Sequence, residues 1–158
     1  MSTAAQVFEQ LLKSGHLLVT AESCTGGMVA AAITDIAGSS AVFDRGFVTY
    51  SNAAKHQMLG VPNVLIETHG AVSEAVAKAM AQGALKLSNA TIAISITGIA
   101  GPTGGTETKP VGLVHFCCST LKHGDKHERK IFSGDRAEVR ASACEHALGM
   151  ISQTLLLG

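Results

Sequence analysis

The sequence predicts an α/β fold, namely a three-layer α/β/α sandwich around a mixed and mostly parallel sheet. Two observations support it: strand-like apolar runs alternate with helical segments early in the chain, and two further strand-like runs joined by a turn follow later. The chain has 158 residues, 46% of them apolar and 15% charged, so it can bury one sizeable core but is short for two domains. We therefore expect one domain over residues 1–158.

The first predicted elements are a helix, a strand and a second helix. Apolar side chains have helical spacing over residues 7–13 and stop before Gly15, a residue type common at helix C-termini. An apolar run over residues 17–20 predicts a strand. A glycine-containing turn then leads into a helix of small residues over 28–36, which we expect Gly38 to close.

A second strand is predicted over residues 47–50, and two more helices follow it. Asn52 is a residue type that caps helices, and Gly60, just ahead of a proline, ends the helix that it opens. Ser73 caps an alanine-rich helix that runs to residue 87. These segments continue the alternation of strands and helices.

The second half of the chain predicts a buried strand, a glycine-rich loop, an antiparallel hairpin and a final helix. The buried strand is rich in β-branched residues, and half of the loop is glycine. Asp135 and Glu138 have the spacing of a capping box, which opens the final helix. In order, these segments are residues 91–96 (strand), 98–105 (loop), 111–120 (strand), 123–125 (hairpin turn), 130–132 (end of the partner strand) and a helix that reaches residue 155.

Composition and charge argue against several classes of protein. Twelve basic residues balance twelve acidic ones, and there is one tyrosine and no tryptophan, which argues against nucleic-acid binding by charge or by base stacking. The sequence shows neither a secretion signal nor an apolar run long enough for a membrane span, so we expect no membrane partner. The cysteines lack metal-ligand spacing, so we expect reduced thiols and no metal site; they are Cys24, Cys117, Cys118 and Cys144.

Ser23 is the candidate nucleophile, because it lies between the end of the first strand and the start of a helix. The backbone amides near Thr25, Gly26 and Gly27 are expected to point outward, and such amides suit a phosphate or an oxyanion. The alternative is that Ser23 or Thr25 only caps the helix.

Lys55 is the candidate base for Ser23. If Asn52 caps its helix, Lys55 is the third helical residue, where the helix dipole and partial burial both favour the neutral amine. Tyr50 lies at the expected strand end, and its hydroxyl can relay a proton or align the lysine. The alternatives are a solvated lysine and a half-buried ring. Cys24 is a rival nucleophile, since a helix N-terminus lowers the pKa of a thiol, but no histidine is placed to assist it.

The glycine-rich loop is a candidate anion cradle, because its backbone amides are not covered by side chains. It matches neither the dinucleotide-binding fingerprint nor a Walker loop. Thr97 at its entrance can add a hydroxyl donor. Arg136 and Arg140 lie one turn apart on the final helix and can hold a phosphate or carboxylate, or alternatively form surface salt bridges. The glycines of this loop are Gly98, Gly101, Gly104 and Gly105.

Six motifs occur in a recognisable order along the chain. They are Ala21-Glu22-Ser23-Cys24-Thr25-Gly26-Gly27, Val48-Thr49-Tyr50-Ser51-Asn52 with Lys55, Gly70-Ala71-Val72-Ser73, Thr97-Gly98-Ile99-Ala100-Gly101-Pro102 with Gly104-Gly105, Lys109-Pro110-Val111-Gly112, and Phe132-Ser133-Gly134-Asp135-Arg136. Together they resemble the C-terminal domain family of the competence-damage-inducible protein CinA. Stand-alone members of that family, the PncC type, are nicotinamide-nucleotide amidases.

The resemblance implies an activity and a set of residue roles. Family members hydrolyse the carboxamide of nicotinamide mononucleotide to nicotinate mononucleotide and ammonia, in the bacterial cytoplasm, and commonly as homodimers. The mechanism needs no cofactor. The serine, lysine and tyrosine roles fall on Ser23, Lys55 and Tyr50, and the substrate-site roles on Thr97 and Arg136, with Arg140 as the second choice. A non-catalytic nucleotide-binding or partner-regulating module, and an amidase for another small amide, are the alternatives.

Overall fold

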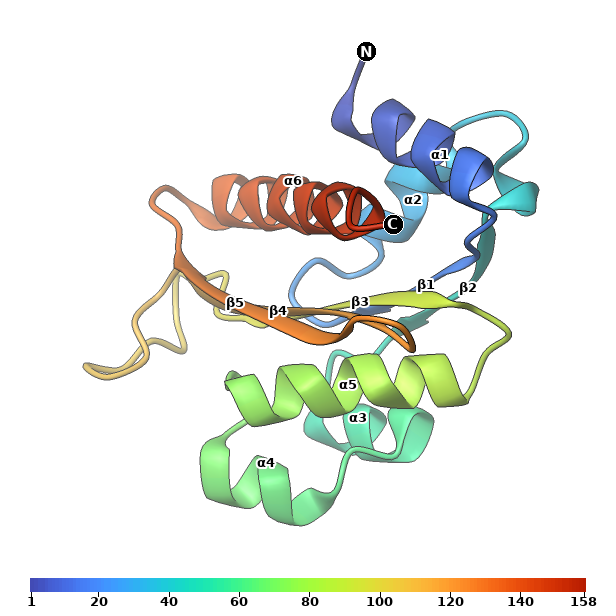
Figure 1. Cartoon of the computed structure of the whole chain (residues 1–158). Coiled ribbons are helices and arrows are strands. Elements are labelled where there is room, and N and C mark those ends of the chain that lie inside the picture. The colour runs from blue at the N-terminus through green and yellow to red at the C-terminus, as the bar shows by residue number, and fades with distance from the viewer.

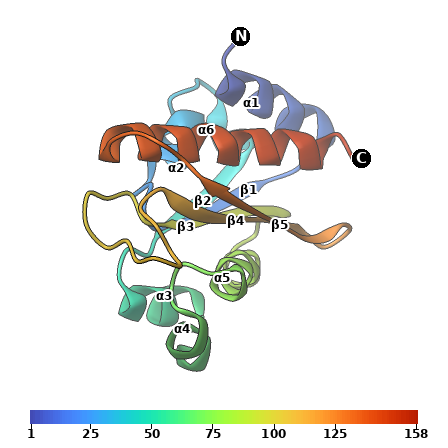
Figure 2. The same cartoon turned by 90° about the vertical axis from the view of Figure 1, so that its left-hand side faces the viewer.

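In the computed structural model, which describes residues 1–158, a five-stranded sheet lies between two groups of helices (Figure 1). Helices α1, α2 and α6 cover one face of the sheet, and α5 covers the other, with α3 and α4 packed against α5 on that side (Figures 1 and 2). The strands are Leu18–Glu22 (β1), Phe43–Val48 (β2), Ile92–Gly98 (β3), Leu113–Thr120 (β4) and Gly124–Ile131 (β5). The helices are Thr3–Ser14 (α1), Met28–Thr34 (α2), Asn52–Leu59 (α3), Asn63–His69 (α4), Glu74–Lys86 (α5) and Arg136–Leu155 (α6), with a short 3-10 helix at Ser39–Ala41.

The sheet is mixed, which confirms the predicted fold class. Its strand order is β2-β1-β3-β4-β5, with β1 parallel to both β2 and β3, and with β4 antiparallel to both β3 and β5. Four of the five strands therefore run in the same direction. Every residue of β1 is buried, as expected for a central strand that is covered on both faces. The C-terminal ends of β1 and β3 meet at one edge of the sheet, where open α/β sheets bind ligands.

Two apolar cores, one on each face of the sheet, hold the layers together. The larger core includes Val7 of α1, Ile33 of α2 and Leu148 of α6. The smaller core includes Met80 of α5 and Leu59 of α3. Because burial of apolar surface is the main favourable term in folding, these two cores fix the helices that carry the site residues.

The predicted start and stop signals of several helices are confirmed. Gly15 ends α1 with a positive φ of 73°, a backbone conformation that glycine adopts without strain. The Ser73 hydroxyl caps α5. Asp135 and Glu138 form a capping box at the start of α6, which fixes the position of the arginines in its first turns.

Some predicted boundaries were wrong. Helix α2 ends at Thr34 rather than residue 36, and Gly38 precedes the 3-10 helix instead of closing α2. Strand β2 covers Phe43–Val48 rather than 47–50, because it is a partly exposed edge strand whose polar residues hide it in an apolar pattern. Tyr50 therefore lies two residues beyond the strand.

The remaining differences concern turns and one extra helix. Ser51, not Asn52, caps α3, since the Ser51 hydroxyl accepts the Ala54 amide at 3.0 Å. Helix α4 was not predicted. Strand β4 begins at Leu113 rather than residue 111, and the hairpin turn covers residues 121–123 rather than 123–125. None of the six α-helices has the length and hydrophobicity that a transmembrane helix requires.

Candidate active site

The structure brings Ser23 and Lys55 into direct contact, although 31 residues separate them in the sequence. Ser23 immediately follows β1, and Lys55 lies on α3, which follows the parallel neighbour β2. The Lys55 Nζ donates to Ser23 Oγ at 3.0 Å. Both side chains are buried, with exposed fractions of 2% for Lys55 and 7% for Ser23. A nucleophile and a base are thus within hydrogen-bond distance of each other, as covalent catalysis requires.

Main-chain oxygens hold the lysine in place. The Lys55 Nζ also donates to Thr49 O at 3.0 Å and to Tyr50 O at 3.2 Å. Because Ser51 is the cap, Lys55 is the fourth rather than the third residue of α3. Burial lowers the pKa of Lys55, since removing the ammonium from water disfavours its charged form. Lys55 therefore loses its proton more easily than a solvated lysine does, and its neutral amine can act as a base.

Glu22 occupies the position where outward-pointing helix amides were expected. Its buried carboxylate accepts hydrogen bonds from the Val29 and Ala30 amides at 3.0 and 3.1 Å and from the Thr25 hydroxyl at 2.7 Å. The Gly26 amide is also engaged, by Ser23 O. The amides of Val29 and Ala30 at this helix start therefore already have an internal carboxylate as their hydrogen-bond partner.

The turn from Ser23 to Gly27 is held from its other side by Arg140. The Arg140 Nε donates to Cys24 O at 3.0 Å, and Nη2 donates to Thr25 O at 3.3 Å. Arg140 and the predicted ligand residues Thr25, Gly26 and Gly27 thus belong to the framework of the turn.

Arg136 links Tyr50 to the loop between β3 and β4. Its Nη2 donates to Tyr50 Oη at 2.9 Å and its Nη1 donates to Gly101 O at 2.8 Å. The Tyr50 side chain is exposed, and its hydroxyl contacts Arg136, whereas only its main-chain carbonyl contacts Lys55 and Ser23. The tyrosine and the arginine consequently form one hydrogen-bonded pair beside the serine and lysine.

The predicted anion cradle has a packing explanation for three of its four glycines, and a Cβ on Gly105 would lie 2.8 Å from Val111 N. A Cβ on Gly98 would lie 2.7 Å from a Val114 methyl and 3.1 Å from Cys24 Sγ, and a Cβ on Gly101 would lie 2.5 Å from a Val111 methyl. Glycine at these positions allows the loop to pack tightly. Thr97 at the loop entrance donates its hydroxyl to Ala71 O at 2.9 Å.

A cavity of about 190 Å³ collects most of the reactive candidates. Six predicted residues line it: Ser23, Tyr50, Lys55, Thr97, Gly98 and Arg136. The predicted Thr25, Gly26, Gly27, Gly101, Gly104, Gly105 and Arg140 do not. The lining also includes Cys24, the rival nucleophile, and four residues that were not proposed as ligand residues, namely Asn52, Ala71, Val72 and Ala100. The motif Gly70-Ala71-Val72-Ser73 was the only sequence signal for the Ala71–Val72 wall.

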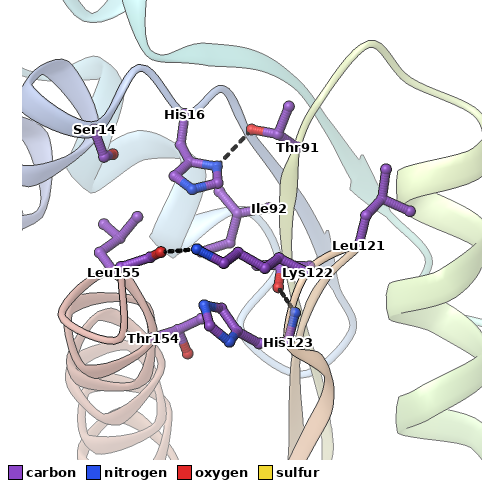
Figure 3. A pocket seen from close by; sticks show the side chains of 11 residues that line it. Ser14, His16, Thr91, Ile92, Leu121, Lys122, His123, Thr154 and Leu155 are labelled. Atoms are coloured by element: carbon purple, nitrogen blue, oxygen red, sulfur yellow. Dashed lines mark hydrogen bonds between the residues drawn. The ribbon is translucent and has the colours of Figure 1, made fainter.

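A larger cavity, of about 510 Å³, lies at the opposite end of the sheet (Figure 3). It lies between the starts of β1 and β3 and the end of α6, and contains none of the candidate residues. In Figure 3, His16 contacts Thr91. The Lys122 amine donates to the carbonyl oxygen of Gly158. The site with paired nucleophile and base is therefore the smaller cavity.

Cys24 faces the small cavity but is a poor rival to Ser23. Burial raises the pKa of the Cys24 thiol to about 11. A thiol is nucleophilic as its thiolate, and this one stays protonated at neutral pH. The structure thus favours the serine.

Comparisons with known proteins agree with the resemblance drawn from the motifs. The profile of the CinA C-terminal domain matches residues 1–155. The chain is 54% identical to the nicotinamide-nucleotide amidohydrolase PncC of Escherichia coli strain K12 over 156 residues, covering 99% of this chain and 94% of that protein. It is also 53% identical to a putative competence-damage inducible protein of Caldicellulosiruptor saccharolyticus, covering 95% of this chain but only 36% of that longer protein.

A crystal structure of a competence/damage inducible protein from Agrobacterium tumefaciens has the same fold. It superposes with a TM-score of 0.93 at 46% sequence identity, covering 97% of this chain and 93% of the other. A second such structure, from Klebsiella pneumoniae, has a TM-score of 0.93 at 37% identity and covers all of both chains.

Proposed function

Because the chain belongs to the CinA C-terminal domain family, we propose that it is a nicotinamide-nucleotide amidase. In this proposal it hydrolyses the carboxamide of nicotinamide mononucleotide to nicotinate mononucleotide and ammonia. The Escherichia coli relative, which matches nearly end to end, is named for this class of reaction. Both the family and the site geometry support an enzyme that acts on a small, non-peptide amide.

The contact between Lys55 and Ser23 is the observation that carries the proposal. A neutral amine has two N–H donors and one lone pair. If the carbonyls of Thr49 and Tyr50 accept the two N–H groups, the lone pair faces Ser23 and can accept its hydroxyl proton. Lys55 then acts as the general base, and Ser23 Oγ attacks the carboxamide carbon.

The tetrahedral intermediate needs a donor for its oxyanion. Of the amides around the nucleophile, those of Gly26, Val29 and Ala30 are already engaged. We assign the oxyanion to the amide of Cys24, which directly follows the nucleophile and lines the cavity. One such donor contributes about 3 kcal/mol to the stabilisation of the transition state.

The protonated Lys55 completes the first half of the reaction by giving its proton to the leaving nitrogen. Ammonia departs, and an ester between Ser23 and the nicotinate carbonyl remains. Water then attacks this ester with Lys55 again as the base, which releases the carboxylate and restores the serine hydroxyl. Tyr50 supports these steps through its carbonyl, which holds the lysine.

The size of the cavity indicates how the substrate is placed. About 190 Å³ suits the pyridine ring and its carboxamide, so the ribose and phosphate lie toward the exposed Tyr50. Arg136, beside the Tyr50 hydroxyl, then provides the positive charge for the phosphate. We expect a substrate that lacks the phosphate, such as nicotinamide riboside, to react poorly.

Ammonia release from nicotinamide mononucleotide, measured with a chelator present, tests the proposal. The Ser23→Ala and Lys55→Ala variants should each lose at least about a thousandfold in kcat and remain folded. Either variant retaining more than a tenth of the wild-type rate would rule out the serine–lysine pair. The Cys24→Ala variant keeps its main-chain amide and should stay active, and its inactivation would support the thiol instead.

A nucleotide-binding module without catalysis is the second candidate. It predicts that the wild type binds nicotinamide mononucleotide, measured by calorimetry, but releases no ammonia. A panel of other carboxamides tests whether the enzyme instead prefers a different small amide.

A further inference from the structure

Glu22 is a buried carboxylate that directly precedes the nucleophile. Its side chain is fully buried and accepts three hydrogen bonds, from the Val29 and Ala30 amides and from the Thr25 hydroxyl. We propose that Glu22 is a positioning residue: its carboxylate fixes the turn that carries Ser23, so that Ser23 Oγ stays in line with Lys55. This inference rests on the proposed function.

The way in which α2 is capped supports this role. Helices are usually capped by the side chain of the residue just before their first turn, but that residue here is Gly27, which has no side chain. Glu22 replaces this cap from the last position of β1, across the whole turn of residues 23–27. Burying a carboxylate costs free energy unless the carboxylate is hydrogen-bonded. The hydrogen bonds of the Glu22 carboxylate connect the start of α2 to the residue next to Ser23.

The main chain of Glu22 joins the turn to the base. The Glu22 carbonyl accepts the Thr49 amide at 2.9 Å, and Thr49 O in turn accepts Lys55 Nζ at 3.0 Å. Ser23 N donates to Ile96 O at 2.9 Å, which continues the pairing with β3. A change in the position of Glu22 would therefore move the nucleophile relative to the groups that hold the lysine.

Opposite charges hold the two sides of the turn. Glu22 accepts from amides on one side, and Arg140 donates to the carbonyls of Cys24 and Thr25 on the other. Together they fix the turn without touching the cavity, since neither side chain lines it. Because Glu22 lies outside the cavity, a substitution of Glu22 should lower kcat rather than raise KM.

Glu22→Gln tests the role because glutamine has the same shape but only one acceptor oxygen. Its amide nitrogen would face one of three hydrogen-bond donors, so the turn must shift. Misplacing a catalytic group by about 1 Å can cost a hundredfold in rate. We expect kcat to fall by about tenfold to a hundredfold, with KM within about twofold of the wild type. Glu22→Asp, which keeps both acceptors on a shorter side chain, should recover part of the loss.

The experiment measures kcat, KM and thermal stability for the two Glu22 variants and for Ile33→Val. Ile33 packs α2 into the larger core and lies outside the turn of residues 23–27, so its variant controls for general loosening of that helix. A Glu22→Gln variant with kcat within twofold of the wild type would overturn the proposal. So would an Ile33→Val variant with an equal loss of kcat.

Labelling by a fluorophosphonate gives a readout that does not depend on the substrate. Ser23 Oγ bonds to phosphorus and displaces fluoride, while its proton passes to Lys55; the Ser23→Ala variant is the blank. We expect Glu22→Gln to slow labelling by about tenfold or more. If the wild type labels but releases no ammonia, the proposed function fails while positioning is still tested. Equal labelling rates of a folded Glu22→Gln variant and the wild type would overturn the positioning role.

Discussion

At the scale of single residues, the burial of Lys55 determines how the reaction depends on pH. Its pKa is lowered from the ordinary lysine value of 10.5, chiefly by desolvation. Because the base must be neutral, kcat/KM should rise with pH as the lysine loses its proton and reach half its maximum below pH 10.5. A pH–rate profile from pH 5 to 10 measures this. A rate that falls across that range would contradict lysine as the base.

The site residues differ in how far the sequence alone predicts them. Ser23 and Lys55 follow neighbouring parallel strands, so topology predicts that they meet. Glu22 was missed as a buried residue because a charged side chain at a strand end is usually solvated. The Tyr50 contact was also predicted incompletely, since a residue pattern shows a hydroxyl but not which main-chain carbonyl will face an amine.

At the scale of elements, the close contact between α3 and α5 depends on Gly83. A Cβ at this position would overlap the carbonyl oxygen of Leu59, the last residue of α3. Gly83→Ala should lower the free energy of unfolding by about 1 to 3 kcal/mol, because overpacking outweighs the better helix propensity. Activity should fall too, since Lys55 lies one turn earlier on α3. Urea denaturation and ammonia release measure both effects.

Gly149→Ala is the matched control. Gly149 lies within α6, and a Cβ there would meet no atom within 4 Å. Alanine should raise the free energy of unfolding by up to about 1 kcal/mol. If Gly83→Ala were equally stabilising, the close packing of α3 on α5 would be wrong.

The β4–β5 hairpin contains a pair of histidines, the buried His115 and the half-buried His127, that makes stability depend on pH. His115 Nδ1 lies 2.8 Å from His127 Nε2. Burial, followed by the nearby charges of His127, Arg129 and Lys109, lowers the pKa of His115 to about 4, while Glu74 opposes this shift. Between about pH 6.5 and 4 the unfolded chain therefore binds more protons than the folded chain, and stability falls as the pH falls.

Thermal unfolding at several pH values tests this element. The wild type should lose stability steadily from pH 6.5 towards 4, and His115→Asn should show a shallower dependence. The remaining slope in the variant has the same sign, because burial also lowers the pKa of His127. Identical pH profiles for the two proteins would assign the effect to other groups.

At the scale of the whole molecule, the sequence predicts the α/β class and the mixed sheet better than the boundaries. Strands β1, β3 and β4 are central and almost fully buried, so an apolar run locates them. The edge strands β2 and β5 are partly exposed and have polar residues, which weakens the pattern. Helix α4 is a short element beside α5 and has few residues in the core, so little in its sequence predicts it.

We propose that the protein forms a homodimer, as its resemblance to the family implies. Several large apolar side chains are exposed, among them Leu121 at the β4–β5 turn and Leu156 after α6. Light scattering coupled to size exclusion should give a mass of twice the 16.2 kDa of one chain. A mass of one chain at micromolar concentration would contradict the dimer.

The oxygens that hold Lys55 belong to the backbone of Thr49 and Tyr50. Every amino acid has such a carbonyl oxygen, so a point mutation at position 49 or 50 keeps the acceptors of the Lys55 hydrogen bonds. The position of the lysine amine depends instead on the number of residues between these carbonyls and Lys55. Inserting or deleting one residue between Tyr50 and Lys55 would turn the amine away from the serine. We therefore expect related sequences to vary in the residues of this segment but not in its length.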